Sequence, residues 1–328
     1  MMHVSILVPE GHTSLPNIDG TLQILQEVNT FRIRLRKPPL FQVELVGLHK
    51  KIKQRNGLYT VQPDKIIGEI EKTDLIIIPA MHGDMAEATK KNYAFIPWLK
   101  DQHAAGAEIA SFCIGAFFLA ETGLLDGKKC STHWVAANEF RALYPNIEVV
   151  DEKIMTAEDG LYTSGGAYAF LNLLVYLIEK FAGRETAIFI SKAFMIDIDR
   201  FTQSPFSIFQ GQKLHDDEPV KKAQEYIEEN FTEKISIDDL AKNIALGRRN
   251  LERRFKKATS NTLAEYMQRV KIEVAKKGLE SGKKNVSEVM YEVGYNDSKA
   301  FRNIFKRLTG MSPVDYRSKY NKHAAVLA

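Results

Sequence analysis

One cysteine of the 328-residue chain stands where a thiol could do chemistry. The apolar, strand-like run AEIASFC ends at Cys113, and a helical pattern follows it directly. A side chain in such a strand-to-helix turn is exposed and lies at the positive end of the helix, which favours a thiolate. His133 could act as its base, and backbone amides around His82 and Gly83 could bind an oxyanion. Cys113 is therefore a candidate nucleophile or redox switch.

The other cysteine and the histidines indicate no further chemistry. Cys130 and Trp134 follow the turn-forming segment LLDGKK and are expected to pack. The eight histidines form no close pair in the sequence, and with only two cysteines we expect no zinc site and no cofactor. In a reducing compartment we expect two free thiols instead of a disulfide.

The second group of candidates is basic and lies in the C-terminal third of the chain. Residues 219–328 contain 23 Lys and Arg against 14 Asp and Glu, a formal charge of +9. Residues 1–218 contain 22 against 27, a formal charge of −5. The basic part suggests a polyanionic partner, although an ordinary solvated surface can carry the same charge.

An internal repeat in the basic part favours DNA as that partner. LERRFKKATSNTLAEY (251–266) aligns with FRNIFKRLTGMSPVDY (301–316) at an offset of 50 residues, with apolar and basic positions matched. Each copy predicts a helix, a short break and a second, amphipathic helix. The predicted helices are 238–245 and 248–258 in the first copy, and 286–293 and 297–309 in the second. Helix, tight turn and helix form a supersecondary unit that reads DNA.

Each second helix has an apolar face and an opposite, basic face. In the major groove arginine and lysine pair with guanine and asparagine pairs with adenine, whereas lysines nearer the helix end suit phosphates. The predicted DNA-binding residues are Arg248, Arg249, Asn250, Glu252, Arg253 and Lys256 in the first copy, and Ser298, Lys299, Arg302, Asn303 and Lys306 in the second. One such helix would more often be a solvated surface, but two equivalent faces at a fixed offset favour DNA.

The segment between the copies, 266–281, has apolar residues at helical spacing and predicts one connecting helix. Such a rod would let one chain address two successive major-groove segments, about 34 Å apart. The expected half-sites are direct repeats, for which bending of the DNA could be required.

Residues 220–320 resemble the DNA-binding domain of the AraC/XylS family of transcription regulators. The most specific stretch is the pattern GY…F…FK…G.SP..YR, carried by Gly294, Tyr295, Phe301, Phe305, Lys306, Gly310, Ser312, Pro313, Tyr316 and Arg317. The resemblance implies base reading near the start and middle of each second helix, by Arg249, Asn250, Glu252 and Arg253 and by Ser298, Lys299, Arg302 and Asn303. The sequence departs from the family at Gly247, where a serine or threonine is usual. Because glycine caps a helix less strongly, the first recognition helix is expected to fray more readily.

The first 200 residues have a different pattern. Short apolar runs alternate with longer helical patterns and predict a parallel α/β layer fold; the runs are 4–9, 41–48, 74–80 and 107–113. The length exceeds what one core usually supports, so we expect more than one domain. The expected divisions are a sensor and dimerisation domain at 1–200, a linker at 201–218 and a helical DNA-binding domain at 219–328.

Two blocks, SFCIGAFFLAETGLLDGKKCSTHW and TSGGAYAFLNLLVYLIE, resemble the ThiJ/PfpI superfamily, also called class I glutamine amidotransferase-like. The resemblance covers about 3–200 and implies a flavodoxin-like parallel sheet sandwich and a homodimer. Enzymes of the superfamily place a carboxylate from the loop after the first strand beside the cysteine. Here Asn17 takes that position, with Glu10 and Asp19 out of register, and an amide cannot be that acid or base. We therefore interpret the surroundings of Cys113 as a ligand- or oxidant-sensing pocket, with no catalytic residue.

Together these features predict a bacterial transcription regulator, with an α/β sensor joined to an all-α domain of two helix-turn-helix units. The expected partners are double-stranded DNA, a small-molecule effector, a second copy of the chain and RNA polymerase. We expect a cytoplasmic protein without membrane contact, because no run approaches the length of a membrane span and the N-terminus lacks the features of a signal peptide. The alternative is an amidase- or hydratase-like enzyme that uses Cys113, with the basic domain as a tether.

Overall fold

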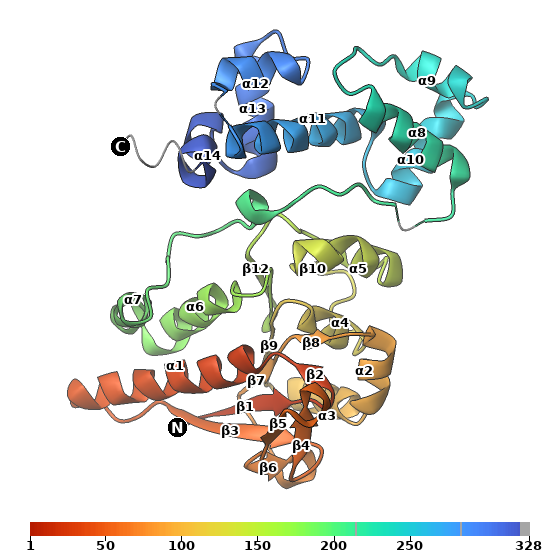
Figure 1. The fold of residues 1–328 in the computed structure, drawn as a ribbon. Helices are drawn as coiled ribbons and strands as arrows, with labels where there is room; N and C mark the ends of the chain where they lie inside the picture. Colours follow the sequence, from red (N-terminus) through yellow and green to blue (C-terminus); the bar gives the residue numbers. More distant parts are fainter. Residues whose placement is uncertain (214, 283, 322–328) are drawn as a thin grey trace. The chain divides into compact units, whose positions relative to one another are not determined.

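A seven-stranded sheet runs through the first of the two units into which the chain divides, Met1–Gln203 and Ser204–Ala328 (Figure 1). The computed structural model describes residues 1–213, 215–282 and 284–321. In spatial order the strands are β12 (Met155–Glu158), β13 (Leu161–Ser164), β9 (Glu108–Ser111), β7 (Leu75–Ile78), β1 (Met2–Val8), β3 (Phe41–Gly47) and β6 (Lys65–Ile66). Every neighbouring pair is parallel except β12 with β13.

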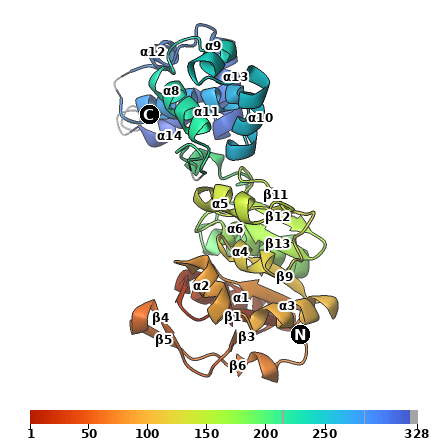
Figure 2. The ribbon, with the colours of Figure 1, turned by 90° about the vertical axis from the view of Figure 1, so that its right-hand side faces the viewer.

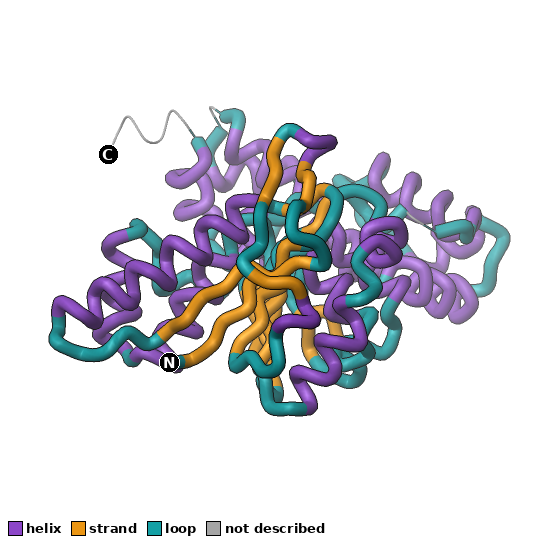
Figure 3. The backbone as a smooth tube through the Cα atoms, turned by 90° about the horizontal axis from the view of Figure 1, so that it is seen from below, coloured by secondary structure: helices purple, strands orange, loops and turns teal. Residues whose placement is uncertain are grey.

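Helices cover both faces of this sheet (Figures 2 and 3). One face is covered by α1 (Leu15–Arg34), α6 (Phe170–Ala182) and α7 (Arg184–Ala193), and the other by α3 (Phe95–Ala104), α4 (Gly115–Ala120) and α5 (Ala137–Leu143). Each face has its own apolar core because strand side chains alternate: Ile6 of β1 belongs to one core and Leu7 to the other. Strands buried on both faces are continuous apolar runs, which is why the sequence predicted this fold. The flavodoxin-like sandwich is confirmed.

Short elements fill the connections of the first unit. β2 (His12–Thr13) pairs with β8 (Met81–His82), β4 (Ile52–Gln54) with β5 (Tyr59–Val61), and β10 (Lys129–Cys130) with β11 (Glu148–Val149). The others are α2 (Met85–Lys91) and the 3₁₀ turns η1 (Arg55–Gly57), η2 (Ile67–Glu69) and η3 (Trp134–Ala136), while η4 (Ser204–Phe206) opens the second unit. Among the described residues, none of the helices has the length and apolar character to cross a membrane.

The second unit is helical throughout its regular elements. Its helices are α8 (Glu218–Glu229), α9 (Ile237–Asn243), α10 (Arg248–Thr259), α11 (Leu263–Glu280), α12 (Val286–Glu292), α13 (Ser298–Thr309) and α14 (Pro313–Tyr320). α9 with α10, and α12 with α13, are the two predicted helix-turn-helix units. α11 is the predicted connecting helix, and the all-α fold of this part is confirmed.

α11 belongs to both apolar cores of the second unit. Tyr266 and Val270, in its first half, are buried with residues of α8, α9 and α10. Ile272 and Leu279, in its second half, are buried with residues of α12, α13 and α14. One continuous helix is therefore the wall that the two helix-turn-helix units share.

The turn between the two helices of each unit has the same left-handed geometry. Its residue is Ala245 in the first copy (φ 55°) and Gly294 in the second (φ 75°). A side chain makes this conformation costly, and glycine adopts it without penalty. At Gly294 a β-carbon would also lie 2.4 Å from the carbonyl oxygen of Thr232. Only the second copy therefore carries the residue that this geometry favours.

The predicted linker, 201–218, is divided between the two units. Gln203, near its start, donates its backbone N–H to the carbonyl oxygen of Glu152 in the first unit (3.0 Å). Four residues later, the carbonyl oxygen of Ser207 accepts a bond from Nζ of Lys276 in α11 (2.6 Å). Much of this segment is thus bonded to one unit or the other.

We predict that Gly294→Ala lowers the free energy of unfolding of the protein by about 2–3 kcal/mol, because the methyl group meets Thr232 and the left-handed backbone loses its glycine. Denaturant unfolding followed by circular dichroism measures the change. Gly68→Ala is the control, since a β-carbon there has no atom within 4 Å. Equal losses in the two variants would contradict the steric explanation.

Candidate functional site

The predicted strand-to-helix turn at Cys113 is present between β9 and α4. Cys113 has a φ of +56°, a conformation that costs a residue with a side chain about 1–3 kcal/mol. Its N–H donates to the carbonyl oxygen of Ser164 at 3.1 Å, and its carbonyl oxygen accepts from the hydroxyl of Thr132 at 3.0 Å. The turn is therefore held from two sides, by the last residue of β13 and by the loop that follows β10.

Loops from several strands meet at this edge of the sheet. The carboxyl ends of neighbouring parallel strands lie together, and binding sites of such folds form there. The N–H of Phe112 donates to the carbonyl oxygen of Ile78 at 2.9 Å, and the N–H of Ser14 donates to the carbonyl oxygen of Ala80 at 2.8 Å. The loops after β1, β7 and β9 are thereby joined next to Cys113.

The thiol of Cys113 is buried, with 3% of the residue exposed. Burial raises its pKa to about 11, and the hydrogen bond from the N–H of Ile114 offsets only part of that effect. α4 is a single short helix of six residues. The sequence predicted an exposed side chain and a thiolate stabilised by the helix; both expectations are wrong, because the side chain is buried and burial disfavours the thiolate.

The ring of His133 is hydrogen-bonded to the backbone next to it in sequence. Its Nδ1 accepts a hydrogen bond from the N–H of Val135 at 3.2 Å, so the neutral ring carries its proton on Nε2. Burial, with a smaller effect from nearby His82, lowers the pKa of His133. Among the described residues no hydrogen bond joins His133 to Cys113.

The predicted oxyanion site around His82 and Gly83 stays a prediction. His82 is the last residue of β8 and pairs with His12 of β2. Gly83 follows with a φ of +99°, in an exposed turn. Burial lowers the pKa of His82, and the charges of Arg55 and His12 act in the same direction. A lowered pKa disfavours a positive charge on this ring.

Asn17 is buried in the first turn of α1 and has a structural bond. Its Oδ1 accepts from the N–H of Ala80 at 3.1 Å, which fixes α1 to the loop after β7. The two carboxylates near it in sequence are bonded elsewhere: Glu10 lies 3.2 Å from Nε2 of His49, and Asp19 accepts from Gln23 at 2.7 Å. No hydrogen bond joins any of these side chains to Cys113 in the described part of the chain.

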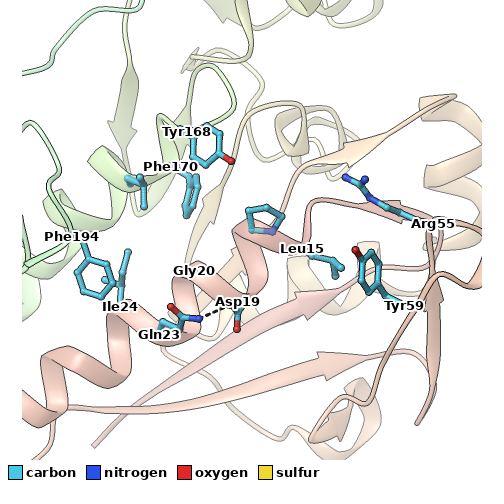
Figure 4. Close-up of a pocket in the computed structure, with 12 residues that line it drawn as sticks. Leu15, Asp19, Gly20, Gln23, Ile24, Arg55, Tyr59, Tyr168, Phe170 and Phe194 are labelled. Atoms are coloured by element: carbon cyan, nitrogen blue, oxygen red, sulfur yellow. Dashed lines mark hydrogen bonds between the residues drawn. The ribbon is translucent and has the colours of Figure 1, made fainter.

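A groove of about 580 Å³ lies beside α1 (Figure 4). Its walls are largely apolar and aromatic, and they include Leu15, Tyr168, Phe170 and Phe194. Arg55 and Tyr59 line the side opposite Phe194. No sequence pattern predicted this groove, because its walls come from segments far apart in the chain. Neither Cys113 nor His133 lines it.

The two second helices of the C-terminal unit present the predicted polar faces. Leu251 and Phe255 of α10, and Phe301 and Phe305 of α13, are at most 1% exposed. Except for half-buried Glu252, all the predicted DNA-binding residues are exposed; these are Arg248, Arg249, Asn250, Arg253, Lys256, Ser298, Lys299, Arg302, Asn303 and Lys306. The structure therefore gathers them on two comparable surfaces, one on each helix.

The polar face of α10 contains internal bonds. Arg248 lies 3.0 Å from Asp238 of α9 and 3.1 Å from Glu252, one turn later in α10. Arg253 donates to Oδ1 of Asn250 at 3.2 Å. Binding of bases by these residues would have to exchange such bonds for bonds to DNA.

The polar face of α13 is arranged differently. Within the described residues, no ion pair joins Lys299, Arg302 or Lys306 to an acidic group. Asp297 caps the helix by accepting from the N–H groups of Lys299 and Ala300 at 2.8 and 3.2 Å. At the start of α10, Gly247 offers no side-chain cap. The first recognition helix thus lacks a side-chain cap, as the glycine in the sequence led us to expect.

Two interactions of functional interest were missed in the sequence. Arg254 of α10 makes paired bonds of 2.8 Å to Asp217, the cap of α8. Gln203 has a buried side chain bonded to the loops beside Cys113. The glycine pair in TSGGAY was the available signal for the second interaction, since adjacent glycines often mark a close approach of another group.

Comparison with known proteins agrees with the division into two units. The helix-turn-helix domain family matches residues 240–319, and the DJ-1/PfpI family matches residues 27–180. The HTH-type transcriptional regulator GbdR of Pseudomonas aeruginosa (strain UCBPP-PA14) is 26% identical over 260 residues, which are 78% of this chain and 69% of GbdR.

Two solved structures resemble the chain in fold. An AraC family transcriptional regulator from Pseudomonas putida has a TM-score of 0.51 at 18% identity, covering 59% of this chain and 100% of the other. Drosophila melanogaster DJ-1beta has a TM-score of 0.50 at 18% identity, covering 60% of this chain and 98% of the other. At these identities the likeness shows the fold alone.

We predict that alkylation of Cys113 by iodoacetamide accelerates about tenfold per pH unit from pH 7 to pH 9, because only the thiolate reacts and the pKa of about 11 lies above this range. Peptide mass spectrometry of timed samples measures the rate. Cys130, whose pKa is about 12, is the internal reference and should react more slowly. A rate that is already constant between pH 6 and pH 8 would contradict the buried, protonated thiol.

Proposed function

Because this chain joins a DJ-1/PfpI-family domain to an AraC-type helix-turn-helix domain, we propose that it is a transcription regulator that binds DNA with two recognition helices and senses a small molecule or an oxidant with its first unit. The observation that carries the proposal is the pair of exposed basic faces on α10 and α13, built by equivalent residues of a repeat and fixed to one helix, α11. A regulator related to GbdR fits this arrangement better than an enzyme does.

The geometry of α11 supports binding to two consecutive parts of one DNA face. A helix of 18 residues is about 27 Å long, close to the spacing of successive major-groove segments. Since the two helix-turn-helix units follow one another in the same order along one chain, the proposed half-sites are direct repeats. Bending of the DNA makes up the difference between the length of α11 and the spacing of successive major-groove segments.

We propose that some side chains of α10 and α13 contact bases and that others contact phosphates. Arg253, Arg302 and Asn303 lie near the middle of their helices and are proposed to contact base edges. Lys256 and Lys306 lie nearer the ends and are proposed to contact phosphates. The remaining predicted contacts are Arg248, Arg249, Asn250, Glu252, Ser298 and Lys299.

A sensing role for the first unit is supported by what surrounds Cys113. The thiol is protonated at neutral pH, and Nδ1 of His133 accepts a hydrogen bond from the backbone N–H of Val135. Asn17 stands where enzymes of the superfamily have a carboxylate. These three features oppose nucleophilic catalysis, which needs a thiolate and a positioned base. They are compatible with slow oxidation of the thiol or with binding of an effector. We propose that this unit is not catalytic.

Other partners follow from the regulator function. A second copy of the chain and RNA polymerase are proposed partners of the protein. A regulator of chromosomal genes acts where the chromosome lies, so we propose a cytoplasmic location for this protein.

The first experiment is selection of the full-length protein on a library of random duplexes at two salt concentrations, because DNA affinity depends on salt. The proposed function expects enrichment of one bipartite, non-palindromic site with half-sites about one helical turn apart. If duplexes are retained in a salt-sensitive way but without a preferred sequence, the proposal is wrong, and the basic unit is only an electrostatic tether to DNA. Turnover that is lost in Cys113→Ser would favour the enzyme instead.

We predict that Arg253→Ala weakens the complex with the selected duplex by about 1–3 kcal/mol, whereas Lys256→Ala weakens selected and random duplexes alike and reduces the salt dependence. Fluorescence anisotropy titrations at several salt concentrations measure both. Arg184→Ala, which removes an exposed arginine of the first unit, is the control and should change neither affinity. Equal losses on every duplex for both α10 variants would disprove these separate roles.

A further inference from the structure

Gln203 is the last residue of the first unit, and its side chain is buried beside the Cys113 turn. Only 3% of the residue is exposed, although the chain leaves the unit at the next residue. Its backbone N–H donates to the carbonyl oxygen of Glu152 at 3.0 Å. The end of the unit is thus attached by both backbone and side chain.

The amide of Gln203 joins two loops in a fixed orientation. Its Oε1 accepts from the N–H of Gly166 at 2.8 Å. Its Nε2 donates to the carbonyl oxygen of Thr132 at 2.9 Å and more weakly to that of Lys153 at 3.3 Å. Rotating the amide by half a turn would set donor against donor and acceptor against acceptor. The amide therefore ties the loop after β13 to the loop after β10.

The two glycines of the loop after β13 lie against this side chain, and one of them leaves no space for a β-carbon. A β-carbon at Gly165 would lie 2.6 Å from the amide of Gln203. A β-carbon at Gly166 would lie 3.5 Å from Oε1 of Gln203 and 3.8 Å from Nε2 of His133. A β-carbon would therefore clash with Gln203 at Gly165, whereas at Gly166 it would make ordinary contacts with Gln203 and His133.

Two short routes lead from this amide to Cys113. Thr132 accepts from Gln203 with its carbonyl oxygen and donates to the carbonyl oxygen of Cys113 with its hydroxyl, at 3.0 Å. Ser164 accepts from the N–H of Cys113 at 3.1 Å, and it lies two residues before Gly166. Each bonded group of the Cys113 backbone therefore reaches Gln203 through a few atoms.

The chain beyond Gln203 is bonded to the DNA-binding unit almost at once. The carbonyl oxygen of Pro205 accepts from the hydroxyl of Tyr320 in α14 at 3.1 Å. The carbonyl oxygen of Ser207 accepts from Lys276 of α11, as described above, and its side chain bonds within the segment. Since α11 is the wall of both helix-turn-helix units, this segment ends on the element that sets their spacing.

We propose that Gln203 is a positioning residue that couples the Cys113 turn to the DNA-binding unit. A ligand or modification that displaces Thr132 or the loop at Gly166 breaks the bonds of Gln203 and loosens the segment from Ser204 onward. By linkage, a ligand that binds at this turn and changes the affinity for DNA by some factor has its own affinity changed by DNA by the same factor. The inference rests on the proposed function and adds the route by which its two units communicate.

The test uses iodoacetamide as a probe that enlarges Cys113 in the full-length chain. At pH 9 the sulfur bonds to the acetamide carbon, iodide leaves, and the thiol proton passes to the buffer. Cys130→Ala restricts the modification to Cys113. Hydrogen–deuterium exchange is then measured in peptides that cover 163–170 and 204–212. We expect exchange to accelerate about fivefold or more in both peptides, a coupling of ordinary size.

Gln203→Met should remove the coupling. It keeps the length of the side chain but has no amide, so the 204–212 peptide should exchange faster before modification and gain nothing from it. Gln54→Met is the matched control: Gln54 is equally buried and its amide also bonds two backbone groups, of Pro9 and Thr13. This control should retain the full response. If Gln203→Met does not fold, Gln203→Glu, which puts an acceptor against Thr132, replaces it with the same expectation.

Unchanged exchange of 204–212 in the modified parent protein would overturn the proposal. So would the same acceleration in Gln203→Met as in the parent. The duplex selected by the protein gives a second readout, because its affinity should change about fivefold or more on modification only where Gln203 is present. Failure to select any duplex would refute the proposed function and leave the exchange result to decide the coupling by itself.

Discussion

The packing of two apolar cores against one helix, α11, is the constraint on which DNA recognition by this protein depends. Phe255 lies edge-on to Tyr266 with ring centres 5.2 Å apart, and Phe305 lies edge-on to Tyr316 at 5.4 Å. The hydroxyl of Tyr266 also donates to Glu228 of α8, and the hydroxyl of Tyr316 donates to Glu280 of α11. The first half of α11 thus packs against the first helix-turn-helix unit, and its second half packs against the second. The recognition helices are spaced by a single covalent rod.

The first unit keeps the backbone of a reactive turn while its surroundings suppress the reactivity. Cys113 retains the left-handed conformation that projects a side chain at the carboxyl edge of the sheet. Thr132 and Ser164 hold this conformation by bonding its backbone, and the residue is only 3% exposed. Burial then disfavours the charged thiolate by more than a short helix can recover. A site of this kind responds to events that open it, which suits a sensor better than a catalyst.

Periodicity and the internal repeat were enough to predict a parallel α/β layer fold, both helix-turn-helix units and the turn at Cys113, and the resemblance to a known superfamily implied the flavodoxin-like sandwich. Such features follow from local patterns, in which the spacing of apolar residues decides what is buried. The protonation of Cys113, the tautomer of His133 and the bonds of Gln203 could not be predicted, because each depends on groups brought together only by folding. Gln203 illustrates the difference: its partners Thr132 and Gly166 are 71 and 37 residues away in sequence. The DNA contacts remain predictions that the exposed faces of α10 and α13 support.

The two copies of the repeat share a shape but differ in how much strain they contain. The second copy has glycine at both left-handed positions, Gly294 and Gly310, whereas the first has Ala245 and Ser260. The first recognition helix also begins at Gly247 without a side-chain cap. Local opening therefore requires less free energy in the first copy. As the temperature rises, there should be a range in which the second recognition helix still binds its half-site and the first no longer does. Selectivity for the complete operator would then be lost at a lower temperature than binding to DNA.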